Sequence, residues 1–508
     1  MAAFGLSQLV STRPPSGRSV LPGRFLRRLL RASVLWVVTL MLIAVAAQAA
    51  RMSVPYESWM GGYLGSQKIG YMSFKIDEAD FDGISGYRIA SVLNSRLKIL
   101  DADLTQIVNT VVYTDADFNP LKEDFNMSSG GKKTSVKATF ESDAVDCVVS
   151  GETGGTNVRV PIPAGARLVG DMVFGLLDTT LEIGKQYSVH YFNPLTLAVD
   201  ELKVKVKGKE KIVSAGREVE TYVLFNSTPM GDLTIWQEAD GSVVQAKAVM
   251  GIVFKREPKE EAMAGMGAGE QEDFATLTSV KPNRKIPNPR QLRSLGVVMT
   301  GITDAEFLIS DSRQSASFVG AKPGSVRYKI RAEEFRAEKS ISRPVTDPQF
   351  SEHLTSSPYL DFDKQAVAAK SAEIVGDEKS AYRGAQKIRA WVYGNMVTRA
   401  DIGIARSASD VLESREGVCR DYAILFGALA RAAGIPCKVV SGVLYTQDAF
   451  YYHSWVECYV GEWVPFDATL PTDFVDATHV KMAEGDATSM FSLSKVIGGL
   501  KADVRTFH

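Results

Sequence analysis

The chain has 508 residues, of which 45% are hydrophobic and 23% charged, and its net charge at pH 7 is −1. This composition is ordinary for a folded soluble protein, and the length suggests two to four domains. Nucleic-acid binding is excluded as the leading function, because it requires a basic patch and the chain carries no excess of basic residues outside its first segment.

Residues 1–49 are typical of an export signal. They contain six arginines and no acidic residue, and the arginines precede a 14-residue apolar run from Val34 to Ala47. A run of this length is short for a membrane span, which needs about 20 residues. Ala47-Gln48-Ala49 fits a small-residue cleavage site. We therefore predict a signal peptide over residues 1–49 and an exported, periplasmic protein. An uncleaved segment that anchors the chain to the membrane is the alternative.

Residues 50–256 are expected to be an antiparallel β domain. Apolar and polar residues alternate strictly in Leu202–Lys207 and in Ser135–Phe140, which is the two-residue period of a strand with one buried face. Asp240-Gly241 and Ser129-Gly130-Gly131 are typical hairpin turns between such runs. The pattern predicts one large, curved antiparallel sheet.

Two less distinctive regions follow. Residues 257–270 are rich in Glu, Gly, Ala and Met without periodicity, so we interpret them as a linker. Residues 271–345 form a small β-rich region with strand-like runs at Gly296–Met299 and Ser325–Ile330. No function is indicated for this region by its sequence.

Residues 346–508 change to a mixed pattern that begins with helices. A first helix starts near Asp363 and ends at Gly376, and a second has a predicted buried face that comprises Ala381, Ala385, Ile388 and Val392. A third helix begins near Cys419, after Gly417 and Val418, and ends at Gly434 before Pro436. Cys419 therefore lies in the first turn of a helix, where free N–H groups and the positive end of the dipole favour a thiolate.

Three strands are predicted after this helix. Lys438–Leu444 and His453–Val460 form a hairpin, and a turn at Gly461-Glu462 leads to a third strand that starts at Trp463. Alternation places His453 and Asp467 on the same face of the sheet. An aspartate beside a histidine fixes the imidazole tautomer and stabilises the imidazolium. The pattern thus predicts Cys419 as nucleophile, His453 as general base and Asp467 as the carboxylate that orients it.

These segments resemble the transglutaminase-like superfamily of papain-related cysteine enzymes, in its exported bacterial form. The family pattern has a Gly-x-Cys helix start, an Arg-Ala-x-Gly-Ile-Pro helix exit, a His-x-Trp-x-Glu strand and a Trp-x-Pro-x-Asp-x-Thr strand, all found within residues 417–469. The resemblance covers roughly residues 360–480 and implies the same roles for Cys419, His453 and Asp467. It implies an α+β fold, in which a papain-like core of helices and antiparallel sheet follows the N-terminal β domain. The family also needs a second oxyanion donor, which the sequence does not locate.

The four cysteines allow one disulfide hypothesis, because an exported protein meets an oxidising compartment. In the predicted hairpin, Cys437 and Cys458 stand opposite each other on neighbouring strands. A disulfide between them is one interpretation, and two small buried residues are the other.

No dinucleotide fingerprint, phosphate loop, zinc helix or serine elbow is present, so we expect no cofactor and no metal. The leading function is acyl transfer on a peptide or amide bond of the cell envelope through a Cys419 thioester, with hydrolysis favoured over transfer to an amine. Trp455 and Trp463 are candidates for the walls of an amine groove. The alternative function is a non-catalytic scaffold with a ligand- or envelope-binding β domain.

Overall fold

A computed structural model of the chain describes residues 52–99, 101–171, 176, 179–267, 273–321, 323–400 and 404–508. The signal peptide predicted for residues 1–49 and the end of the predicted linker, residues 268–270, lie outside the described residues. None of the helices in these described ranges combines the length and the apolar character that a membrane crossing requires.

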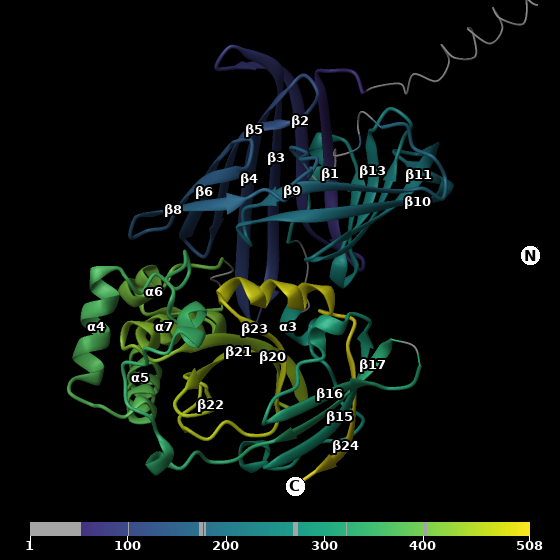
Figure 1. Ribbon diagram of the computed structural model, residues 1–508. Helices are drawn as coiled ribbons and strands as arrows, with labels where there is room; N and C mark the ends of the chain where they lie inside the picture. The colour runs from purple at the N-terminus through teal and green to yellow at the C-terminus, as the bar shows by residue number, and fades with distance from the viewer. Residues whose placement is uncertain are drawn as a thin grey trace, which may run out of the picture. The chain divides into compact units, whose positions relative to one another are not determined.

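The N-terminal part of the described chain is one antiparallel sheet of 14 strands, as the alternating pattern predicts (Figure 1). The strand order across the sheet is β8-β7-β6-β5-β4-β3-β2-β1-β14-β13-β12-β11-β10-β9, so each strand pairs with its neighbour in sequence except where β1 pairs with β14. The strands are β1 (Tyr56–Leu64), β2 (Gln67–Phe81), β3 (Ile84–Ile99), β4 (Ala102–Asp115), β5 (Pro120–Ser129), β6 (Lys132–Phe140), β7 (Ala144–Ser150), β8 (Gly155–Pro161), β9 (Gln186–Asn193), β10 (Ala198–Ser214), β11 (Arg217–Thr228), β12 (Gly231–Gln237), β13 (Val243–Lys247) and β14 (Ile252–Arg256).

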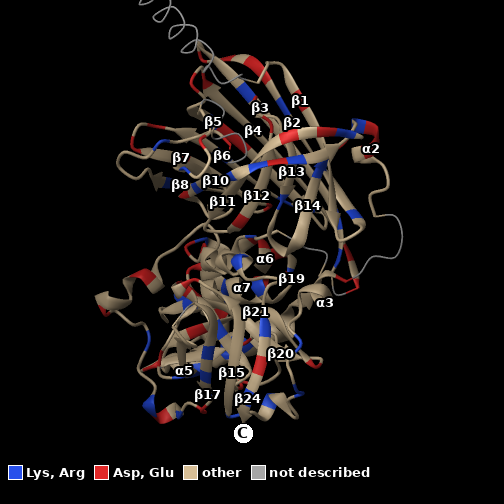
Figure 2. Ribbon diagram, turned by 90° about the vertical axis from the view of Figure 1, so that its right-hand side faces the viewer, with Lys and Arg blue, Asp and Glu red and all other residues tan. Residues whose placement is uncertain are grey.

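Strand β10 shows why these residues form a sheet with one buried face. Leu202, Val204 and Val206 are buried, whereas the lysines between them are exposed. The predicted hairpin turn between β5 and β6 is present, and Gly130 and Gly131 adopt positive φ angles of 57° and 77° there. Figure 2 shows Lys and Arg interspersed with Asp and Glu along these strands and along the rest of the chain.

The segment predicted to be a linker is partly helical. Helix α2 (Lys259–Met263) follows β14, and its Ala262 is completely buried. No periodic signal in the sequence indicated this helix, because five residues are too few to show a 3.6-residue repeat. A second short helix, α3 (Phe274–Thr278), comes directly after the undescribed residues.

The small β-rich region shares its sheet with the end of the chain. Strands β15 (Ser294–Ile302), β16 (Gln314–Phe318) and β17 (Gly324–Arg331) combine with β24 (Lys501–Phe507) in the order β16-β17-β15-β24. One hydrophobic cluster joins residues 280–332 to residues 443–504. The predicted boundary at residue 345 therefore does not separate two hydrophobic cores.

The remaining core contains four helices and a second four-stranded antiparallel sheet. The helices are α4 (Gln365–Val375), α5 (Ala381–Asn395), α6 (Ala408–Ser414) and α7 (Cys419–Ala432). The sheet order is β22-β21-β20-β23, with β20 (Cys437–Thr446), β21 (Ala449–Tyr459), β22 (Trp463–Phe466) and β23 (His479–Gly485). The short strands β18 (Val397–Thr398) and β19 (Glu416–Gly417) pair in parallel just before α7. The 3₁₀ helices are η1 (Val249–Gly251), η2 (Pro289–Gln291), η3 (Ala305–Phe307), η4 (Ala337–Lys339), η5 (Pro348–Leu354) and η6 (Ala487–Lys495).

Figure 1 shows α4 to α7 gathered at one end of the β20–β23 sheet and the β15–β17 sheet at the other. The predicted buried face of α5 is confirmed, because Ala381, Ala385, Ile388 and Val392 are all inaccessible to solvent and pack in one cluster with α7. Helix α7 is thus held between its neighbouring helices and the sheet that carries His453.

The hairpin of β20 and β21 has the predicted register. Cys437 pairs with Cys458, and a two-residue turn at Gln447 and Asp448, with φ angles of 47° and 65°, joins the strands. Both cysteines are buried free thiols. Burial raises the pKa of the Cys458 thiol, and the neighbouring Cys437 raises it further. The structure thus favours the two-small-residues interpretation over the disulfide.

Candidate active site

The turn before Cys419 is shaped by Gly417 and Asp421. Asp421 is completely buried, and its Oδ2 accepts the N–H of Val418 at 2.9 Å. A Cβ on Gly417 would lie 2.5 Å from the Cβ of Asp421, closer than two carbon atoms can approach without displacement. Glycine at position 417 therefore lets the chain enter α7 tightly, so that Cys419 opens the helix as predicted.

A buried arginine, Arg406, stabilises this turn. Arg406 is 1% exposed and donates to the Ser414 hydroxyl at 2.9 Å and to the backbone carbonyl of Glu416. It also forms an ion pair with Asp421 at 3.5 Å. The guanidinium thus joins α6 and the first turn of α7, which fixes the position of Cys419 relative to the rest of the core. The sequence analysis did not identify Arg406.

The predicted His453–Asp467 contact is present. The Nε2 atom of His453 lies 2.7 Å from Oδ2 of Asp467. Strand β22 brings the carboxylate there because Glu457 pairs with Pro465 and Val456 with Phe466. Since Nε2 is engaged by the carboxylate, Nδ1 is the ring nitrogen left to face the Cys419 thiol.

The ionisation of both groups matches a thiolate–imidazolium pair. Burial opposes ionisation of Cys419 most strongly, yet the hydrogen bond and the positive charge of His453 bring the pKa of the thiol below its ordinary value. Burial likewise opposes the charged form of His453, but the charge and hydrogen bond of Asp467, and then those of Cys419, raise its pKa to about 10. Opposite charges within contact distance stabilise each other's ionised form.

A second histidine, which lies outside the family motifs, contacts the same carboxylate. The Nε2 atom of His479 lies 3.2 Å from Oδ2 of Asp467, and its side chain is completely buried. The other oxygen of Asp467, Oδ1, accepts the N–H and the hydroxyl of Thr469 at 2.8 and 2.6 Å. Despite its burial, Asp467 therefore has a pKa well below its ordinary value, because of His453 first and His479 second.

His479 follows a repeat of the Asp467 turn. Asp476-Ala477-Thr478 repeats the letters of Asp467-Ala468-Thr469, and Oδ1 of Asp476 accepts the N–H and hydroxyl of Thr478 at 2.8 and 2.5 Å. Asp-x-Thr turns of this type hold a carboxylate by local hydrogen bonds. This repeat was the sequence signal that could have led to His479.

The small β-rich region contributes two guanidinium groups to this loop. Arg290 of η2 forms an ion pair with Oδ2 of Asp476 at 2.8 Å, and Arg313 donates to the Asp476 carbonyl at 2.6 Å. Burial tends to raise the pKa of Asp476, but His479, Arg290 and Thr478 hold it below its ordinary value. Residues 271–345, to which the sequence assigned no role, therefore fix the loop that carries His479.

Glu457 of the His-x-Trp-x-Glu strand belongs to a buried ion cluster. Lys481 lies 2.8 Å from Glu457, 2.7 Å from Glu484 and 2.5 Å from Asp311. Lys438 lies 2.7 Å from Glu484 and 3.2 Å from Glu457. Burial opposes the charge of Lys481, but these three carboxylates raise its pKa. Glu457 thus links its own strand β21 to β20 and β23, and none of these ion pairs involves Cys419.

Two groups of side chains among the described residues could offer three ligand atoms to a metal ion. His453, Asp467 and His479 place theirs within 4.8 Å of one another, and so do Asp311, Glu457 and Glu484. In the first group, the ligand atoms already hydrogen-bond to each other. In the second, the Lys481 ammonium lies between the carboxylates. Both arrangements are complete without an ion.

The two candidate tryptophans have packing roles. Trp455 is 2% exposed and stacks against His453, with ring centroids 6.2 Å apart. Trp463 packs against Phe350 and lies under the Lys438 ammonium, 4.5 Å from it. A cleft of about 410 Å³ instead runs along β22 and the loop after Asp467, with Tyr382, Val464 and Asp473 among its walls.

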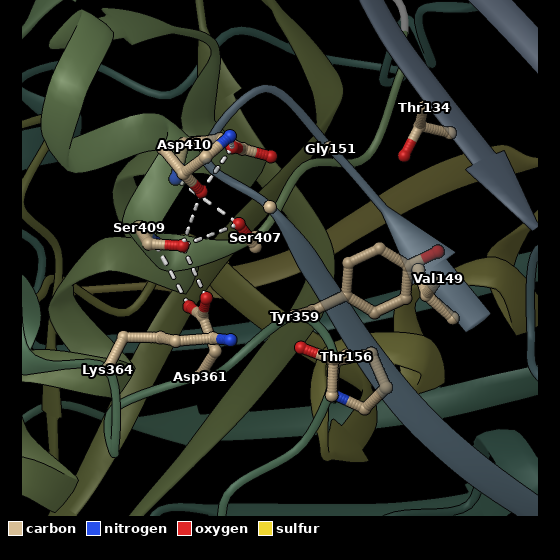
Figure 3. Close-up of a pocket in the computed structure, with 13 residues that line it drawn as sticks. Thr134, Val149, Gly151, Thr156, Tyr359, Asp361, Lys364, Ser407, Ser409 and Asp410 are labelled. Carbon is tan, nitrogen blue, oxygen red and sulfur yellow. Dashed lines mark hydrogen bonds between the residues drawn. The ribbon is translucent and has the colours of Figure 1, made fainter.

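The large sheet contacts the segment that leads to Cys419 (Figure 3). At the tip of the β7–β8 hairpin, the N–H and hydroxyl of Thr153 donate to Oδ1 of Asp410 at 2.7 and 2.6 Å, and the hydroxyl lies 2.9 Å from Ser409. Gly151 approaches Asp410 so closely that no Cβ would fit. Asp410 belongs to α6, from which the chain runs through β19 to Cys419.

Comparison with known families agrees with this site. Residues 368–468 match the model of the transglutaminase-like superfamily. This segment is a transglutaminase-like core. It contains Cys419, His453 and Asp467, and its helices and antiparallel sheet are the papain-like half of the α+β fold. Residues 58–254 match a second family, a protein of unknown function named DUF3108, which corresponds to the large sheet.

Individual relatives are distant. An uncharacterised protein of Mycobacterium leprae (strain TN) is 32% identical over 108 residues, which are 19% of this chain and 38% of that protein. The chain thus spans well under half the length of this curated relative.

Three solved structures show partial likeness to the chain. A candidate cysteine protease from Cytophaga hutchinsonii is 20% identical, with 43% of this chain and 86% of that chain covered and a TM-score of 0.30. The β-barrel-like DUF1849 protein of Brucella abortus is 12% identical, with 40% and 94% covered and a TM-score of 0.31. A candidate protease from Parabacteroides distasonis is 13% identical, with 77% and 68% covered and a TM-score of 0.19. These scores are low, and the assignment of the core rests on the family model.

Proposed function

We propose that the protein is an exported cysteine-dependent enzyme that cleaves a peptide or amide bond through a Cys419 thioester. The observation that supports this most directly is the 2.7 Å contact of His453 with the buried Asp467, next to the Cys419 thiol whose pKa His453 lowers. A nucleophile at a helix start, a base and an orienting carboxylate are the parts that such chemistry requires.

The reaction follows from these contacts. The Cys419 thiolate attacks the amide carbonyl, and the oxyanion that forms faces the free N–H groups at the start of α7. The His453 imidazolium then gives its proton to the departing amine nitrogen as the C–N bond breaks, which leaves a thioester on Cys419. Water gives a proton to the neutral imidazole as it attacks the thioester, and the products are a carboxylic acid and the restored thiol.

Hydrolysis is favoured over transfer to an amine. Water is present at roughly 55 M, so an amine competes only if a groove binds it and excludes water. The two tryptophans considered for such a groove are occupied by packing contacts. The substrate we propose is a peptide or protein of the cell envelope, since the N-terminal segment is typical of an export signal.

The test is a partition experiment with an envelope-derived peptide and a millimolar primary amine, whose products are weighed by mass spectrometry. We expect mainly hydrolysed peptide from the wild-type protein and none from Cys419→Ala. Mostly amine-coupled product would replace hydrolysis by transamidation. Full activity of Cys419→Ala would refute the thioester. If neither the wild-type protein nor Cys419→Ala releases product, and wild-type Cys419 reacts with iodoacetamide no faster than an ordinary thiol, the non-catalytic scaffold is favoured.

A further inference from the structure

His479 is a buried titratable residue that the proposed reaction does not use. This histidine lies at the start of β23 and is completely buried between two aspartates. Its ring faces Trp455 edge-on, with centroids 5.3 Å apart, and lies 5.9 Å from the ring of His453. It touches neither Cys419 nor open solvent in any of the described contacts, so a role must act through Asp467.

Both nitrogens of His479 face oxygen acceptors. Nε2 lies 3.2 Å from Oδ2 of Asp467. Nδ1 lies 3.2 Å from the backbone carbonyl of Asp476 and 3.6 Å from its Oδ2. A carbonyl or carboxylate oxygen can only accept, so a hydrogen on either ring nitrogen has an acceptor in place, Asp476 at Nδ1 and Asp467 at Nε2. The Oδ2 atom of Asp467 thus faces one ring nitrogen of His479 and one of His453.

We propose that His479 is a positioning residue that holds Asp467 between two imidazole rings and thereby sets the pH range in which the Cys419–His453 ion pair forms. A carboxylate charge that is shared between two donors stabilises each of them less than a charge given to one. His479 thus limits how strongly Asp467 favours the protonated form of His453, and it compensates negative charge near the Cys419 thiolate. This inference rests on the proposed function of Cys419 and His453.

The charged groups that face His479 come from several elements. Asp467 follows β22 and Asp476 precedes β23, while His453 lies on β21. Arg290, from the small β-rich region, forms an ion pair with Oδ2 of Asp476, and Arg313 donates to the backbone carbonyl of Asp476. The Arg290 ion pair does not require His479, so removal of His479 changes mainly the charge around Asp467.

The experiment measures the rate of Cys419 alkylation by iodoacetamide against pH, with the labelled peptide mapped by mass spectrometry. In His479→Gln, the amide retains a neutral donor near Asp467 but the ring is lost. We expect the midpoint of the alkylation profile to move to higher pH by about one unit, a tenfold change in the ionisation equilibrium. The NMR titration midpoint of His453 should also rise. His353→Gln is the matched control, because His353 packs on Trp463 and not on Asp467.

The outcomes separate this inference from the proposed function. If wild-type Cys419 alkylates like an ordinary thiol, the proposed function fails. If wild-type Cys419 is reactive below neutral pH but His479→Gln has the same midpoint as wild type, or a lower one, the inference about His479 is overturned. A uniformly slower reaction with an unchanged midpoint would mean that His479 only supports the packing. If His479→Gln does not fold, the test uses Asp476→Asn, which weakens the contact of Asp476 with Nδ1 of His479. The alkylation midpoint must then shift in the same direction by a smaller amount. An unmoved midpoint in Asp476→Asn overturns the inference equally.

Discussion

Replacement of Asp467 by asparagine should reverse the ionisation of His453. Oδ1 of Asp467 already accepts two hydrogen bonds from Thr469. An asparagine would keep its carbonyl oxygen in that place and turn its NH₂ group toward His453. Two donors would then face each other across the present 2.7 Å contact. The imidazole would have to present a lone pair at Nε2 and carry its proton at Nδ1, toward Cys419, where a base needs a lone pair.

The size of the change follows from the pKa of His453. Asp467 is the main reason that this pKa is raised to about 10. Without the carboxylate, we expect a value near the ordinary 6.5. At pH 8.5 the imidazolium fraction would fall from about 97% to about 1%. A raised histidine pKa stabilises the folded state fully below about pH 6.5, and this stabilisation is lost as pH rises through about 10. The loss of folding stability in Asp467→Asn should therefore be largest below about pH 6.5.

NMR titration of the histidine rings is the appropriate assay, since the chain has only five histidines and each can be assigned by a His→Gln variant. The control is Asp473→Asn, which removes a carboxylate of the same loop that binds Arg389 and not a histidine. Equal His453 midpoints in wild type and Asp467→Asn would refute the reasoning. So would a wild-type midpoint near 6.5.

Two further predictions concern stability. Glu123 is buried in the large sheet, and desolvation, with two nearby carboxylates, raises its pKa to about 8. Stability should therefore fall as pH rises from about 4.5 to about 8, by about 3 kcal/mol at pH 7, and Glu123→Gln should raise the melting temperature at pH 7.5 but not at pH 4.5. Equal shifts at both pH values, as expected for exposed Glu141→Gln, would contradict this. Glu457→Gln should cost about 3 kcal/mol in urea unfolding, because it leaves Lys481 with an incomplete set of buried carboxylates. A loss as small as that of exposed Glu462→Gln would show that the cluster does not stabilise the fold.

Local patterns in the sequence predicted α4, α5 and α7, the register of the hairpin and the contact of His453 with Asp467. Each of these depends on periodicity or on a turn within about 15 residues. Gly417 and Gly434 marked the ends of α7 for steric reasons that the structure confirms, since Gly434 has a φ angle of 69° and its N–H binds Arg431. The resemblance to the transglutaminase-like superfamily is confirmed for residues 368–468.

The contacts between distant segments could not be predicted in this way. His479 lies outside the family motifs, although the repeated Asp-Ala-Thr turn before it is visible in the chain. The bond between Arg313 and Asp476 spans 163 residues, and no local period specifies such a pairing. Buried Arg406 and Lys481 are further examples, because a charged residue in a sequence is normally taken to be exposed. Only its partners in the folded chain explain its burial.

The pairing of β24 with β15 has a consequence for how this protein can be divided. The segment that the family model recognises, residues 368–468, ends before His479 and before β23, the edge strand of the β22-β21-β20-β23 sheet. A gene fragment cut to those limits would encode Asp467 without one of its two imidazole partners. It would also expose Tyr445 and Phe450, which are buried against residues from 280–332. A transferable part of the chain must therefore run at least from about residue 280 to the last strand, and even that part loses the contact of Thr153 with Asp410.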